Sequence, residues 1–253
     1  MRASRRAGTS VTTEQELDLP STTAAFYRGF LHTFSCATTY ALAGTFLGTG
    51  ALAHDLGFSL LWTILLNIIV WAGPAQLVLM TMLATGAAWP QIAVAVALSG
   101  VRLFPMAVAL LPQMREKDTP RWHLLLAAHF TAITFMTESI RVFPRVARHR
   151  RIAFCNGYGV GIGSFTTITM IIGYQLAVGL PPTLAVGLLF LAPYSFLLSA
   201  AAGCRDFSDW LALIVGGATV PLVAMLDTGL EVLICGLGGG TLAYIVHRAR
   251  RVR

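Results

Sequence analysis

Eight long apolar stretches dominate this sequence and restrict how the chain can fold. They run approximately over residues 27–52, 58–85, 89–112, 122–143, 153–179, 182–203, 208–226 and 229–247. A helix needs about 20 residues to cross the hydrocarbon core of a bilayer, so each stretch is a candidate membrane span. The runs are unbroken rather than alternating, and backbone groups in lipid must find their hydrogen bonds within the fold. We therefore predict an all-α fold, a polytopic membrane helix bundle.

The composition and the placement of the charges indicate a protein that is surrounded by lipid. Of the 253 residues, 56% are hydrophobic and only 11% are charged, which leaves too little polar surface to coat a water-soluble protein. The net charge of +7 comes from basic residues at the chain ends and in two loops, without the aromatic residues that would indicate nucleic-acid binding. The positive-inside rule then predicts a multi-pass protein of the cell (plasma) membrane with both termini cytoplasmic.

The ends of the chain are polar and the middle is apolar. Residues 1–25 carry both arginines and acidic residues without an apolar core or a cleavage site, so we expect a disordered cytosolic tail rather than a signal peptide. Residues 26–248 form the predicted transmembrane permease domain, and residues 249–253 a basic C-terminal tail.

Two glycine-rich segments are each followed by a turn and by a span that contains a proline. The first set comprises Gly44, Gly48, Gly50, Gly57 and Ala72-Gly73-Pro74, and the second Gly157, Gly159, Gly161, Gly163, Gly179 and Ala192-Pro193. Paired interruptions of this kind are typical of transporters built from two structural repeats. Because Gly and Pro are common in all membrane helices, a bundle without repeats stays an alternative.

Pro74 lies in the middle of a span, directly after Gly73. A proline there removes one backbone hydrogen bond and clashes with the preceding turn, so we predict a kink or break. The N-terminus of the second half-helix would attract a carboxylate. Asn67 and Gln76, on either side of this break, either line a cavity or bond across helices. Similar prolines, each with a purely structural kink as the alternative, are Pro105, Pro193 and Pro221.

Arg102 and Glu138 are the ionisable residues that lie deepest in apolar stretches. An arginine at the centre of a membrane helix costs about 2.5–3.5 kcal/mol on insertion scales, so Arg102 should face an anion, either a substrate carboxylate or a fixed acid such as Glu138. Snorkelling to an interface is the alternative. A lone buried Glu138 can take up a proton, which would suit proton coupling, and a helix-end pair with Arg141 is the alternative.

Signatures of enzymes and of cofactor sites are absent from the sequence. We find no His-Glu-x-x-His, no Gly-x-Ser-x-Gly and no phosphate loop, so we expect neither an enzyme nor a cofactor. The six histidines are scattered and suggest no metal site. The four cysteines form no Cys-x-x-Cys pair, and we expect small apolar packing residues at Cys36, Cys155, Cys204 and Cys235.

Several short elements resemble a known family. They are Tyr27-Arg28-Gly29-Phe30, Ala43-Gly44-Thr45-Phe46-Leu47-Gly48, Val70-Trp71-Ala72-Gly73-Pro74-Ala75-Gln76, Ser99-Gly100-Val101-Arg102 and Met136-Thr137-Glu138-Ser139. In this order they resemble the AzlC family of branched-chain amino acid permeases over roughly residues 27–245, most specifically through Ala72-Gly73-x-x-Gln76. Departures from the family's pattern at Gly100, Met136 and Thr137 leave the substrate open.

The resemblance implies a secondary exporter of branched-chain amino acids, driven by an ion gradient. It also implies a partner, a small hydrophobic membrane subunit of the AzlD type. The expected substrate-binding or coupling residues are Gly73, Pro74, Gln76, Asn67, Arg102 and Glu138. A transporter of another small solute is one alternative function. The other is a non-transporting membrane scaffold or accessory subunit, in which the polar residues only join helices.

Overall fold

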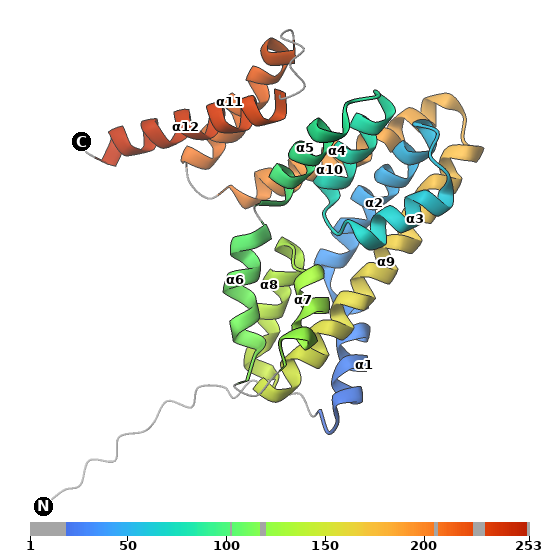
Figure 1. Ribbon diagram of the computed structural model, residues 1–253, viewed down its shortest axis with the longest axis vertical. Coiled ribbons are helices and arrows are strands. Elements are labelled where there is room, and N and C mark those ends of the chain that lie inside the picture. The colour runs from blue at the N-terminus through green and yellow to red at the C-terminus, as the bar shows by residue number, and fades with distance from the viewer. Residues whose placement is uncertain (1–18, 102, 117–119, 205–206, 225–230, 252–253) are drawn as a thin grey trace, which may run out of the picture. The chain divides into compact units, whose positions relative to one another are not determined.

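The computed structural model describes residues 19–101, 103–116, 120–204, 207–224 and 231–251. Within these ranges the chain forms α-helices and short 3-10 helices and contains no strand, which confirms the predicted all-α fold. Figure 1 shows the order of the elements. They are α1 (Thr22–His32), η1 (Thr33–Ser35), α2 (Ala37–Asp55), α3 (Leu60–Ile69), α4 (Gly73–Ala84), α5 (Trp89–Val101), α6 (Leu103–Met114), η2 (Arg121–Leu124), α7 (Leu125–His129), α8 (Ile133–Val142), η3 (Phe143–Arg145), η4 (Arg148–Arg150), α9 (Arg151–Gly179), α10 (Pro182–Gly203), α11 (Phe207–Ala224) and α12 (Glu231–Arg251).

The helices divide into two compact units. The first unit comprises residues 1–36 and 105–162, and the second comprises residues 37–104 and 163–253. The long helix α9 contributes its first part to one unit and its remainder to the other. In the second unit α2 packs against α10, α4 against α5, and α11 against α12.

The predicted break before Pro74 is present and is confirmed. Helix α3 ends at Ile69, and α4 begins at Gly73 with the proline in its first turn. Ala72 between them is extended, with φ −155° and ψ 100°. Proline suits the first turn of a helix, because its missing N–H would have no intrahelical partner there, and its ring prevents α3 from continuing.

The expected interruption at Ala192-Pro193 is wrong, because α10 runs without a break from Pro182 to Gly203. Helix α11 also continues through Pro221. A proline inside a membrane helix frees only one carbonyl, which neighbouring groups can satisfy. At this point α2 lies directly against α10, since a Cβ on Gly48 would overlap the backbone of Ala192. This packing supports the helix, and the paired interruptions that suggested two repeats are therefore not both present.

The helices that are long and apolar enough to span a membrane do not correspond one to one with the eight apolar stretches. In the described part of the chain, Arg148–Gly179 is long and apolar enough to cross a membrane alone, and α5 with α6 would make a second span if counted as one. The stretch at 122–143 contains two short helices, α7 and α8, rather than one. The number of eight crossings therefore stays a prediction.

Glycines allow close helix crossings in both units. In the first unit, a Cβ on Gly29 of α1 would overlap the Phe154 carbonyl of α9, and a Cβ on Gly157 would overlap the Phe26 carbonyl of α1. The second unit has the same reciprocal arrangement between α2 and α9. A Cβ on Gly50 of α2 would overlap the Met170 carbonyl of α9, and a Cβ on Gly173 of α9 would overlap the Leu47 carbonyl of α2. Small residues at such crossings let two backbones approach closely, which is the main packing device of membrane helices.

Candidate functional site

The first candidate site lies at the break between α3 and α4, in the second unit. Gln76 is fully buried and Asn67 is 1% exposed. Nε2 of Gln76 donates to Oδ1 of Asn67 at 3.0 Å and to the carbonyl oxygen of Val70 at 2.6 Å. Nδ2 of Asn67 in turn donates to Oγ1 of Thr167 at 2.9 Å on α9. Of the two predicted alternatives for this pair, bonding across helices is the one that the structure contains.

Two polar features of this break take no part in the hydrogen bonds among Gln76, Asn67 and Thr167. Oε1 of Gln76 is buried and has no hydrogen-bond partner among the described residues. Helix α4 has no side-chain cap at Ala72, and its first intrahelical bond is donated by Gln76 to the Ala72 carbonyl. The amides of Gly73 and Ala75 precede that bond and point out of the helix end. A buried acceptor and an uncapped helix N-terminus therefore occur within one turn.

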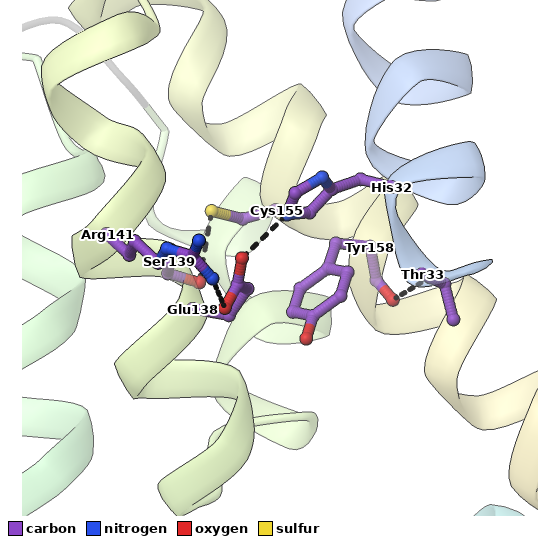
Figure 2. A network of polar contacts seen from close by, with 7 residues as sticks. All are labelled: His32, Thr33, Glu138, Ser139, Arg141, Cys155 and Tyr158. Carbon is purple, nitrogen blue, oxygen red and sulfur yellow. Dashed lines mark hydrogen bonds and ion pairs between the residues drawn. The ribbon is translucent and has the colours of Figure 1, made fainter. Parts of the chain in front are cut away.

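The second candidate site surrounds Glu138 of α8, in the first unit. The residue is 3% exposed, and its two carboxylate oxygens have different neighbours. Oε1 lies 2.9 Å from Nε2 of His32, at the end of α1, and Oε2 lies 3.5 Å from Nη1 of Arg141. Figure 2 shows His32 and Arg141 approaching the carboxylate from two sides. Glu138 is therefore not a carboxylate without a partner, and the alternative pair with Arg141 is present.

Aromatic rings hold the His32 side chain in this position. The imidazole ring lies 5.6 Å from the ring of Phe154 and 5.6 Å from the ring of Tyr158, both on α9. The next residue, Thr33, donates from Oγ1 to the carbonyl oxygen of Tyr158 at 3.4 Å. The end of α1 is thus fixed to α9 by packing and by a hydrogen bond, and the imidazole faces α8 (Figure 2).

The predicted site residues fall into separate groups. Gly73, Pro74, Gln76 and Asn67 come together in the second unit, while Glu138 belongs to the first unit. Arg102 lies outside the described residues, so its expected contact with an anion stays a prediction. Sequence reasoning missed His32 and Cys36 as neighbours of Glu138. The signal available was their spacing of four residues, which places two side chains on one side of a helical turn.

Comparison with known proteins supports the family seen in the sequence motifs. A family model described as AzlC protein matches residues 37–180 of the 253 residues, a range that includes all the predicted site residues. No curated protein matches the chain, and no solved structure matches it. The family match covers more than half of the chain and agrees with a membrane protein related to branched-chain amino acid transport. The chain belongs to the AzlC family.

Proposed function

We propose that this chain is the larger subunit of a secondary exporter of branched-chain or similar small amino acids, and not an enzyme. The observation that carries the proposal is the buried polar group at the break between α3 and α4, where Gln76 keeps an unpartnered oxygen beside an uncapped helix end. A zwitterionic amino acid needs an acceptor for its ammonium and donors for its carboxylate. Both kinds of group are available here within one turn.

The orientation of the substrate follows from these groups. The α-carboxylate binds the amides at the start of α4, because a helix N-terminus carries partial positive charge. The α-ammonium donates to Oε1 of Gln76, whose Nε2 is already engaged with Asn67 and Val70. Leu66 and Met80, buried in the apolar core of the same unit, are neighbours suited to an aliphatic side chain. Since Gln76 is fully buried, the substrate binds in a conformation that opens this region.

A small hydrophobic subunit of the AzlD type is the proposed partner. Ile168, Ile172 and Leu176 form an exposed apolar stripe at four-residue spacing on α9, in the second unit. Such a stripe must be covered by lipid or by another membrane protein. We expect the two polypeptides to copurify from native membranes in mild detergent. A native preparation that contains only this chain and transports without the small subunit would refute the partner.

Export from cells tests the function. Cells without other branched-chain exporters are fed a branched-chain dipeptide, which their peptidases convert to free amino acid, and the amino acid released into the medium is measured. Coexpression of this chain with its small partner should increase release, and either polypeptide alone should not. Absence of release in every combination would favour the non-transporting scaffold.

A substitution at Gln76 connects this flux to the proposed site. Gln76→Met keeps the size of the side chain but removes its acceptor, and we expect release to fall about tenfold or more, the loss of one hydrogen bond to a charged group. Gln113→Met is the matched control, because the Gln113 side chain is exposed and donates to the Ala109 carbonyl of its own helix. Equal release by the wild-type chain and Gln76→Met, at equal membrane abundance, would remove Gln76 from the site.

Substrate analogues test the orientation in proteoliposomes that contain both subunits. Unlabelled leucine should compete with labelled leucine, whereas a branched-chain carboxylic acid of the same skeleton without the ammonium should not. Competition by that acid at the same concentration as leucine would contradict the role given to Oε1 of Gln76.

A further inference from the structure

Three side chains that are common metal ligands meet in the first unit, and the proposed amino acid site uses none of the three. They are His32 at the end of α1, Cys36 directly after η1, and Glu138 of α8. Their ligand atoms, a ring nitrogen, the thiol sulfur and a carboxylate oxygen, all lie within 4.8 Å of one another. We propose that His32, Cys36 and Glu138 form a binding site for a divalent metal ion of the zinc class.

The donor atoms select the class of metal. One nitrogen, one sulfur and one oxygen donor suit Zn²⁺ and Co²⁺, whereas Mg²⁺ and Ca²⁺ prefer oxygen donors alone. On a tetrahedral zinc ion, neighbouring donor atoms lie roughly 3.3–3.6 Å apart. The present contact of 2.9 Å between His32 and Glu138 would open slightly, and separations of up to 4.8 Å would close by about 1 Å, which rotations of the side chains can supply.

Burial and charge favour an ion at this place. Cys36 and Glu138 are each 3% exposed, and a buried anion needs a counter-charge. Arg141 supplies one positive charge beside the Glu138 carboxylate, and a divalent cation would supply the charge needed by the thiolate that forms when a cysteine coordinates a metal. Arg141 lies near Oε2 of Glu138, which leaves Oε1 on the side of His32. The His32 side chain is 26% exposed, so one of the three ligands reaches the surface of the first unit.

The surroundings hold the ligands in place before binding. The rings of Phe154 and Tyr158 pack against the imidazole of His32, and the Thr33 hydroxyl fixes the following turn to α9. Such neighbours orient the ligands of a metal and raise its affinity. Binding would join the segment at residues 32–36 to α8, so the ion should stabilise the first unit against unfolding.

Cobalt titration of the purified full-length chain tests the site directly. After removal of any affinity tag and treatment with a chelator, Co²⁺ is added and the absorption spectrum is recorded. We expect saturation near one equivalent, visible bands of tetrahedral intensity and a near-ultraviolet band of thiolate-to-cobalt charge transfer, all of which Zn²⁺ should abolish. Absence of saturable Co²⁺ binding by the wild-type chain would overturn the proposal.

Two cysteine variants identify the thiolate. Cys36→Ser should lose the charge-transfer band and weaken Co²⁺ binding at least about tenfold, the effect expected from loss of a ligand. Cys155→Ser is the matched control, because Cys155 is equally buried in the same unit but bonds to Ser139 instead. A charge-transfer band that persists in Cys36→Ser and disappears in Cys155→Ser would also overturn the proposal.

A further variant keeps the test informative if Cys36→Ser folds poorly. His32→Gln retains both Cys36 and Glu138, so it should keep the charge-transfer band while its affinity for Co²⁺ falls at least about tenfold. Size-exclusion profiles and circular dichroism establish that the compared variants are folded. Wild-type affinity in folded His32→Gln would show that the ion binds elsewhere.

Discussion

Nε2 of Gln76 lies 3.0 Å from Oδ1 of Asn67, and this hydrogen bond joins the two helices on either side of the break at residues 70–72. Both side chains are almost completely buried, so neither can exchange its partner for water. The bond therefore has two roles. It holds the half-helices together, and it orients the amide so that Oε1 of Gln76 stays available.

A double-mutant cycle on Asn67 and Gln76 should reveal coupling. We expect Asn67→Ala and Gln76→Ala each to lower the thermal stability of the detergent-solubilised chain, and the double variant to lose less than the sum. Hydrogen bonds between membrane helices contribute about 0.6 kcal/mol on average and up to about 1.7 kcal/mol, which sets the expected size of the coupling. Thermal unfolding of the four proteins measures it, and strictly additive losses would contradict the shared bond.

Pro74→Ala should reduce transport without preventing membrane insertion. Alanine restores an N–H and removes the ring clash, which allows α3 to continue toward α4 and closes the uncapped helix end. Amino acid release at equal membrane abundance is the measurement. Pro193→Ala is the matched control, because α10 is already continuous at that proline, and it should transport like the wild type. Normal release by Pro74→Ala would reduce the break to a structural kink.

The sequence was sufficient to predict the helical class and the break at Pro74, because both follow from local properties. Long apolar runs exclude strands in lipid, and a proline ring acts on the turn directly before it. The same local rule failed at Pro193, where the outcome depends on packing. Helix α2 lies against α10 there through Gly48, a contact between residues that are far apart in the chain.

The group around Glu138 could be predicted only in part. Arg141 follows three residues later on the same helix, and this spacing gave the pair as an alternative. His32 lies 106 positions away from Glu138, so no periodicity or motif connects them. The four-residue spacing of His32 and Cys36 was visible in the sequence, but the carboxylate that completes the group comes from the fold.

Gly157→Ala should destabilise the first unit. A Cβ at this position would overlap the backbone carbonyl of Phe26, and a backbone cannot move aside as a flexible side chain can. Overpacking of this kind typically costs about 1–3 kcal/mol. Gly187→Ala in α10 is the control, because an added Cβ meets no atom within 4 Å, and alanine is the better helix former. Thermal unfolding of both variants measures the difference in stability, and equal melting temperatures would contradict the close crossing of α1 and α9 at Gly157.

Arg151→Lys should also weaken the first unit, although the charge is kept. The guanidinium donates to the carbonyl oxygens of Val146 at 3.1 Å, Gln113 at 3.1 Å and Phe143 at 2.9 Å, and it lies over the Phe143 ring. A lysine ammonium cannot reproduce this planar fork. We expect a loss of about 1–2 kcal/mol in thermal stability. The exposed Arg248→Lys serves as the control, and an equal effect of the two substitutions would refute the structural role.

Arg102→Met should abolish transport while leaving the folded yield unchanged. Arg102 lies outside the described residues, but the contacts of Glu138 indicate whether Glu138 needs Arg102 as a counter-charge. If the arginine served mainly to neutralise Glu138, its loss would leave a buried acid uncompensated. Glu138 already lies beside the cation Arg141 and is hydrogen-bonded to His32, so it does not depend on Arg102 for a partner.

The double variant Arg102→Met with Glu138→Gln separates the two explanations. If Arg102 binds a substrate carboxylate, the double variant should remain inactive at normal yield, because no substitution at Glu138 restores that cation. Arg28→Met, a change at an exposed residue of α1, is the control for loss of a positive charge and should transport normally. A fall in the yield of Arg102→Met that Glu138→Gln repairs would identify a structural ion pair, and the substrate carboxylate would then rest on the N-terminus of α4 alone.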